Sequence, residues 1–193
     1  GTVTLAPTVN AAFGTTAGSA TWIFNNLTLR NATTSASSIT ITTEGGGTGP
    51  INVGNLLRLG SASDTGSTTL NATTREWNIN GTNGDPFQIF GASALTASTS
   101  LFSYNGDNGS GTTTVQQATY ARLKINNPAE IFSLEGNTTS TTSTIEDGTL
   151  DIMANSFTTL DDLSFTLANA TLQGTGNVTV GGDVLGVGGF IIN

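Results

Sequence analysis

Apolar and polar residues alternate in short runs along the whole chain. The runs end at Gly, Asn, Asp or Ser, a pattern that is typical of β-strands separated by turns. No stretch has the sustained apolar spacing of an amphipathic helix, and Thr and Gly are too frequent for one. The pattern therefore predicts an all-β protein. We expect strands at residues 2–5, 22–30, 38–43, 55–59, 76–80, 87–90, 101–104, 121–126, 130–134, 149–153, 163–167, 177–180 and 189–192.

Similar segments recur at a long spacing. Residues 24–29 align with residues 120–125 at an offset of 96, and residues 57–59 align with residues 150–152 at an offset of 93. Such self-similarity indicates an internal repeat. We expect an N-terminal strand and assembly segment at residues 1–19, a first β repeat at 20–115, and a second at 116–193 that ends in an assembly strand.

A shorter rhythm lies inside these halves. An apolar-x-apolar triplet followed closely by Asn or Gly recurs about every 20 to 30 residues, for example around Leu27, Leu57 and Leu123. This spacing is typical of one coil of a solenoid, in which each coil buries its inward side chains against the coils on both sides. The pattern predicts a parallel β-solenoid, or β-helix. Tandem antiparallel β-sandwich modules are the alternative.

Two segments carry a resemblance to a known class. The tail at residues 147–189 is similar to secreted parallel β-helix proteins of the autotransporter and haemagglutinin-like type. Residues 77–87, 100–104 and 118–123 resemble Gly/Thr-rich repeat units of large bacterial surface proteins. The resemblance implies an extracellular repeat protein of the cell surface, and it brings no catalytic residues with it.

Composition narrows the function classes. The chain contains no Cys and no His, which excludes Cys/His zinc sites, cysteine nucleophiles and histidine-based triads. Its net charge is −8, and its five basic residues are scattered, so nucleic-acid binding is disfavoured. No apolar run is long enough for a membrane span. We therefore expect a protein that is not an enzyme. The sequence begins at Gly1 rather than Met, which favours a mature, processed product.

Oxygen-rich turns offer the main candidate for metal chemistry. Asn105, Asp107 and Asn108 could hold calcium, which prefers oxygen ligands, although the same residue types are common in plain hairpin turns. The carboxylate pairs Glu146–Asp147 and Asp161–Asp162 could serve a polysaccharide-cleaving enzyme, but they are more typical of solvated turns. We expect no cofactor other than calcium.

Glycosylation sequons are frequent. An extracellular Asn-x-Ser/Thr protein can carry N-glycans, so a glycoprotein is one expectation. The candidate sites are Asn26, Asn31, Asn71, Asn80, Asn108, Asn137, Asn169 and Asn177.

Both chain ends are β-prone and nearly uncharged. Exposed strand edges are normally protected by charge or Pro, and these ends carry little of either. We therefore expect self-assembly into a homopolymer. The candidate assembly residues are Val3, Leu5, Val9, Phe190, Ile191 and Ile192.

These features together predict a structural subunit of an extracellular filament or surface layer, which assembles head to tail through its terminal strands. A cell-surface adhesin stalk or carbohydrate-binding module, with surface glycans as partners, is the alternative. A degenerate polysaccharide lyase or hydrolase is a third, and it would need Asp and Arg side chains converging in a cleft.

Overall fold

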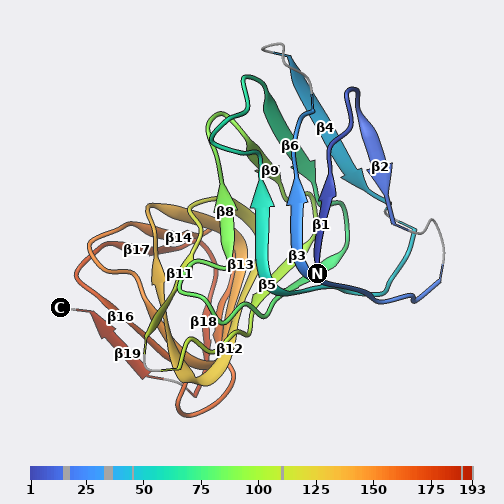
Figure 1. Cartoon of the computed structure of the whole chain (residues 1–193). Coiled ribbons are helices and arrows are strands. Elements are labelled where there is room, and N and C mark those ends of the chain that lie inside the picture. The colour runs from blue at the N-terminus through green and yellow to red at the C-terminus, as the bar shows by residue number, and fades with distance from the viewer. Residues whose placement is uncertain (15–17, 33–36, 45, 110, 188, 193) are drawn as a thin grey trace.

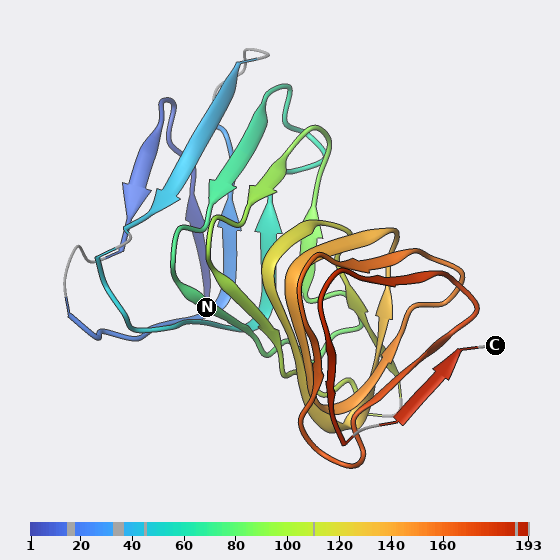
Figure 2. The same cartoon turned by 180° about the vertical axis from the view of Figure 1, so that it is seen from behind.

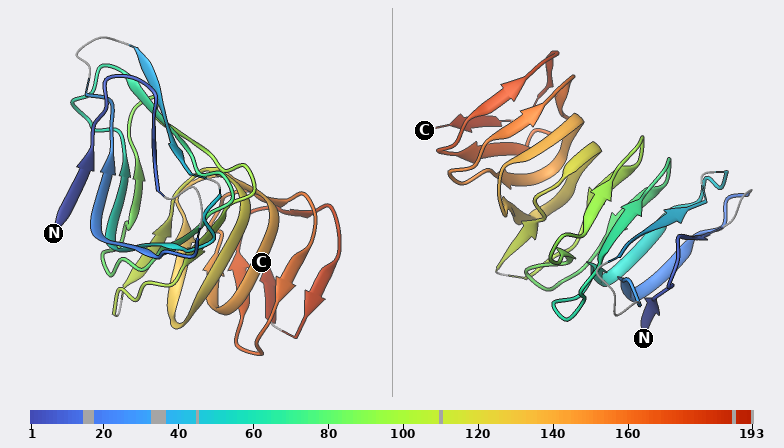
Figure 3. Two further views of the ribbon diagram at one scale, coloured as in Figure 1. Left: turned by 90° about the vertical axis from the view of Figure 1, so that its right-hand side faces the viewer. Right: turned by 90° about the horizontal axis from the view of Figure 1, so that it is seen from above.

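The computed structural model describes residues 1–14, 18–32, 37–44, 46–109, 111–187 and 189–192, with the side chains of residues 189–192 left out. This part of the chain contains strands and no helix, and every strand pair in it is parallel. The strands stack into a β-solenoid of about eight turns, with the N-terminus at one end and the C-terminus at the other (Figure 3). The predicted solenoid is confirmed, and antiparallel sandwich modules are excluded for the described residues.

The strands range in length from three residues to sixteen. They are β1 (Thr2–Leu5), β2 (Ala11–Phe13), β3 (Trp22–Leu29), β4 (Ser38–Thr43), β5 (Ile51–Leu59), β6 (Ser67–Asn71), β7 (Glu76–Ile79), β8 (Phe87–Ile89), β9 (Ala94–Thr96), β10 (Leu101–Tyr104), β11 (Thr112–Val115), β12 (Thr119–Leu134), β13 (Thr138–Asp151), β14 (Phe157–Thr159), β15 (Leu163–Phe165), β16 (Thr171–Gly174), β17 (Val178–Val180), β18 (Val184–Gly186) and β19 (Gly189–Ile192).

Each coil contributes to three faces. The first face is one unbroken ladder from end to end. It consists of residues 22–24 of β3, residues 51–53 of β5, β7, β10, residues 122–125 of β12, residues 143–145 of β13, β15 and β18.

The other two faces are each divided. The second face runs through β1, β3, β5 and β8, and then through β11, β12, β13, β16 and β19, with no ladder between β8 and β11. The third face comprises the separate sheet β2-β4-β6-β9, followed by the starts of β12 and β13, then β14 and β17. The sheet β2-β4-β6-β9 lies opposite the first half of the large sheet, whereas the second half winds as closed coils (Figures 1 and 2).

Coil length changes along the axis. Trp22 pairs with Ile51, whereas Leu123 pairs with the much nearer Ser143, so the coils are longer toward the N-terminal end. The predicted short rhythm therefore corresponds to the length of one coil. The alignment at an offset of 96 joins different faces, because Leu27 lies on the second face and Leu123 lies on the first face. The alignment at an offset of 93 joins positions on one face, because Leu57 and Leu150 both lie on the second face. Stacking continues across residues 115–116, and the division into two repeats stays a prediction.

Several strands lack the alternation of apolar and polar residues that predicts a strand, because their inward side chains are polar. Thr43, Thr68, Thr113, Ser140 and Thr159 are all buried, although hydroxyl groups usually mark the outer face of a strand. Many of these hydroxyls bond to one another or to a neighbouring coil, as Thr43 does to Thr73 at 2.9 Å between Oγ1 atoms. For this reason β6, β11, β14 and the first half of β13 are absent from the prediction. The strands β2, β9, β16 and β18 are also absent, because each is only three or four residues long.

Candidate functional site

The division of the second and third faces creates a joint in the middle of the solenoid. Here β10 alone continues the large sheet from β7 to β12. Large aromatic rings fill the space: Trp77 stacks on Phe102 with ring centroids 5.7 Å apart, and Phe102 contacts Tyr120 at 5.5 Å. Trp77, Tyr104 and Tyr120 are fully buried, so these rings pack in the core and do not form a sugar-stacking surface.

A hydrogen-bond network bridges the joint. The Tyr104 and Tyr120 hydroxyls are 2.9 Å apart, and Tyr120 donates to the carbonyl of Gln116 at 2.7 Å. The Gln116 amide oxygen accepts from the backbone N–H of Ile89 at 3.0 Å, and its amide nitrogen bonds to Glu135. Burial raises the pKa of both tyrosines well above the usual range, so the two hydroxyls stay protonated. The network replaces the missing ladder between β8 and β11.

A carboxylate and an arginine gather beside this network. Asp85 accepts from the Gln88 amide at 3.0 Å, and the Gln88 oxygen accepts from Arg58 Nη2 at 3.0 Å. Partial burial raises the pKa of Asp85, with nearby Glu135 adding to the rise, while Gln88 and Arg58 oppose it. Arg58 also lies over the ring of Phe90, 5.3 Å from its centroid. The guanidinium is thus held by neighbours in its own sheet.

A shallow groove of about 370 Å³ lies on the outside of the joint, beyond the end of β9. Its walls are small and mostly neutral, and its one charged residue, Arg122, donates from Nε to the carbonyl of Thr99 at 3.2 Å. The groove brings no carboxylate toward Arg122. It is lined by Thr74, Ser98, Thr99, Ala121, Arg122, Thr141 and Thr142.

The three candidate calcium ligands all have hydrogen-bonding roles. Asn105 donates to Asn78 Oδ1 at 3.1 Å, as one member of a stack of asparagines on successive coils. Asp107 accepts from the N–H of Gly109 at 2.7 Å, and Asn108 donates to the carbonyl of Thr112 at 3.2 Å. No group of three or more carboxylates suited to a metal ion occurs among the described residues. Plain turn chemistry accounts for these side chains, and calcium binding stays a prediction.

The candidate carboxylate pairs do not converge on one cleft. Glu146 forms an ion pair with Lys124, and Asp147 accepts from Asn169. Asp162 accepts from the N–H of Asp183 in the next coil at 2.9 Å. All of these contacts tie one coil to the next.

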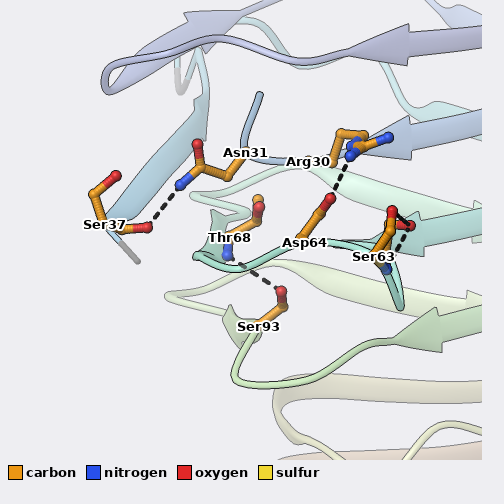
Figure 4. Close-up of polar contacts among 8 residues, drawn as sticks. Arg30, Asn31, Ser37, Ser63, Asp64, Thr68 and Ser93 are labelled. Atoms are coloured by element: carbon orange, nitrogen blue, oxygen red, sulfur yellow. Dashed lines mark hydrogen bonds and ion pairs between the residues drawn. The ribbon is translucent and has the colours of Figure 1, made fainter. Parts of the chain in front are cut away.

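The sequon asparagines differ in exposure. Asn137, Asn169 and Asn177 are exposed, whereas Asn31 is buried and donates to the carbonyl of Ser37 at 2.7 Å (Figure 4). The remaining sequon residues, Asn26, Asn71, Asn80 and Asn108, are half-buried. Asn26 and Asn80 accept hydrogen bonds from Asn55 and Asn105. The exposed asparagines have room for a glycan, and glycosylation itself stays a prediction.

Asparagine stacks tie the turns together on the outside of the solenoid. Asn26 donates to Thr2 Oγ1 at 3.1 Å, Asn55 donates to Asn26 at 2.7 Å, and Asn83 donates to Asn55 at 2.9 Å. The sequence signal for these stacks is a recurring Asn, which lies within β3 and β5 and follows β7. In the sequence alone this signal indicates only turn chemistry, because the spacing between coils varies.

Both end coils carry exposed apolar side chains. Val3 and Val9 are exposed, and Leu5 is half-buried beside them. Val184 is exposed at the other end. Phe190, Ile191 and Ile192 belong to β19, which pairs with β16, and their side chains lie outside the described set.

Comparison with protein-family models, curated proteins and solved structures finds no match to this chain. The resemblance to secreted β-helix repeat proteins therefore stays a prediction. Within the described residues, no helix is long and apolar enough to cross a membrane. The joint and the two ends are therefore the candidate functional regions of the molecule.

Proposed function

We propose that the chain is a structural building block of an extracellular filament or surface layer, in which solenoids stack end to end. The observation that carries this proposal is the state of the two end coils. In the described residues β1 and β2 pair on one side only, and so do β17, β18 and β19. Each end therefore presents unpaired parallel strands.

The end coils also carry little of the usual protection against edge pairing, and Pro7 is the one Pro in their sequence. Residues 1–29 and 184–193 contain no Asp, Glu, Lys or Arg. Monomeric proteins normally place charges, Pro or bulges on exposed strand edges. Two different surfaces that bind each other form a heterologous contact, which does not close and grows into a filament. Backbone hydrogen bonding of this kind is known from strand addition.

The backbone of β18 shows which groups are free to bond to another strand. Leu163 donates to the carbonyl of Asp183 at 3.0 Å, and Val187 donates to the carbonyl of Phe165 at 3.2 Å. Because backbone groups alternate along a strand, the N–H and carbonyl of Val184 point away from β15, toward the open end. Val184 is 57% exposed, so its side chain contributes little to the core.

This arrangement allows a test that leaves the subunit folded. Val184→Pro removes an outward N–H at an edge, where Pro is tolerated, and Val184→Thr keeps that N–H. We expect the unmodified chain and Val184→Thr to form filaments in negative-stain micrographs. We expect Val184→Pro to stay monomeric in sedimentation experiments, with an unchanged melting temperature. An unmodified chain that stays monomeric at about 1 mM would overturn the proposal.

A carbohydrate-binding module is the second candidate, and the surface supports it less well. An exposed row of aromatic side chains on one sheet face would favour such a module. Among the described residues the exposed large hydrophobic side chains are Val, Ile, Leu and Met. The groove at the joint is the best place for a glycan, and its small Thr and Ser side chains offer hydrogen bonds without a stacking ring.

A further inference from the structure

The outward side chains of the first face form a column that runs the length of the solenoid. The middle residue of each strand occupies this column, and the ladder fixes the order of its members. From end to end the column consists of Ile23, Asn52, Asn78, Ser103, Lys124, Thr144, Ser164 and Leu185.

The column is polar in every inner coil and apolar only at its two ends. Ile23 is 78% exposed and Leu185 is 45% exposed. The inner members are half-buried, except Ser103, which is buried, and Asn78 donates to Asn52 at 2.9 Å along the column. A contact between the two ends would bury both apolar side chains and would leave the polar members of the column unchanged.

The inward positions at the two ends differ in size. Phe24 and Trp22 are half-buried at the N-terminal end. At the C-terminal end the equivalent positions hold Gly186 and Val184. Gly186 is exposed, and a Cβ there would lie 1.7 Å from the carbonyl oxygen of Phe165 in the preceding coil, so this position requires Gly. Val184 is exposed in the same way and could cover an indole.

We infer that a second copy of this chain continues the first face across the junction. In this register Val184 lies beside Trp22, Leu185 beside Ile23 and Gly186 beside Phe24 of the next copy. The register is the one that already relates each coil to the next. The inference rests on the proposed end-to-end assembly and specifies its contact.

The first face is the surface best suited to make this contact. Coils at the two ends differ in length: Trp22 pairs with the distant Ile51, whereas Leu163 pairs with the nearer Val184. Inside the chain, a comparable change of coil length interrupts the second and third faces, and the first face alone remains a continuous ladder. At a junction between copies, a short C-terminal coil would meet a long N-terminal coil. The first face would then be the one that continues across the junction.

The backbone is free to bond on both sides of this junction. Trp22 donates its N–H to the carbonyl of Pro50 at 3.0 Å, so the backbone groups of Ile23, one residue later, point away from β5. Val184 points its backbone groups toward the opposite end. Adding one strand to the other would satisfy both sets.

Cysteine cross-linking tests the register, because the chain has no cysteine of its own. Paired positions on adjacent strands lie about 4.8 Å apart, within disulfide reach. We expect a mixture of the single variants Ile23→Cys and Leu185→Cys to form a disulfide-linked dimer on mild oxidation. The matched control mixes Ile23→Cys with Ser164→Cys, which lies one coil further away, at about 10 Å.

The expected result is at least about tenfold more linked dimer from the Ile23/Leu185 mixture than from the control or from either variant alone, since about 10 Å exceeds disulfide reach. If the copies assemble but the two mixtures give equal amounts of linked dimer, or none, the register is wrong and the proposed function still stands. Absence of any assembly would overturn both, and the sedimentation experiment on the unmodified chain detects that case separately.

Discussion

Buried polar residues hold neighbouring coils together at the scale of single side chains. Arg75 is 1% exposed and donates from Nε to the carbonyl of Glu44 at 3.0 Å and from Nη1 to the carbonyl of Gly49 at 2.8 Å. A Cβ on Gly47 would lie 2.1 Å from Arg75 Nη2, so the glycine-rich loop closes directly over the guanidinium. The backbone around Gly47 and Gly49 therefore covers a buried cation.

Asp85 provides a prediction about pH at this scale. Partial burial raises the pKa of its carboxyl group, so the charged form is less favourable in the folded chain than in the unfolded chain. The stabilising effect of the neutral form is present at low pH and is lost as the pH rises through the folded pKa. Asp85→Asn keeps an acceptor for Gln88 without the charge.

We expect Asp85→Asn to raise the melting temperature at pH 7 by about 1–2 °C, a small value because the group is half exposed. At pH 3 the variant and the unmodified chain should melt together, because the carboxyl group is then neutral in both states. Thermal melts at the two pH values test this, with the exposed Asp161→Asn as control. A gain of equal size at pH 3 would contradict the assigned cause.

At the scale of elements, the turns of adjacent coils lie in close backbone contact, as the strands do. A Cβ on Gly106 would lie 1.9 Å from the carbonyl oxygen of Gly81 in the preceding coil, and one on Gly81 would lie 2.1 Å from the carbonyl oxygen of Asn55. Backbone atoms from adjacent coils occupy the space that a side chain would need. These turns therefore require Gly for close approach.

We expect Gly106→Ala to lower the free energy of unfolding by about 1–3 kcal/mol, because backbone must shift to admit the methyl group. The matched control is Gly54→Ala, whose Cβ would have its nearest neighbour at an ordinary 3.6 Å. Urea unfolding measures both variants, and the slope should be unchanged. Equal stability of the two variants would show that the turn stack is not tight.

In the whole molecule, each coil that the structure describes contacts only the coils next to it along the axis. Each inner coil is covered on both sides, whereas the coil of β17 and β18 is covered by described residues on one side only. In stacked architectures of this kind, stability is a sum of coil and interface contributions, so outer coils open first. Assembly would give the outer coils the neighbour that they lack.

We expect hydrogen exchange in the unassembled chain to be at least about tenfold faster in peptides covering β17 and β18 than in peptides covering β13, because opening one end coil breaks a single interface. On assembly, protection should rise in peptides containing Ile23 and Val184 and stay unchanged at β13. Exchange measured by mass spectrometry on both forms gives the comparison. Uniform exchange along the chain would show a single cooperative unit.

The sequence by itself determined the fold class, the approximate coil length and the uncharged ends. Alternation within a strand is a local property with a period of two residues, so it could be found without knowing any partner strand. This is why β1, β4, β10 and β19 were predicted with their observed bounds. Composition also predicted the absence of helix in the described residues, since Thr and Gly disfavour one.

Tertiary structure alone decided which residues meet. Partner strands lie one coil away, and the coil shortens along the axis, so no fixed spacing in the sequence identifies them. The inward Thr and Ser strands, the joint around Tyr104 and Tyr120, and the enclosed Arg75 all depend on that register. So does the column that begins at Ile23 and ends at Leu185, because only stacking shows that both residues share one line on one face.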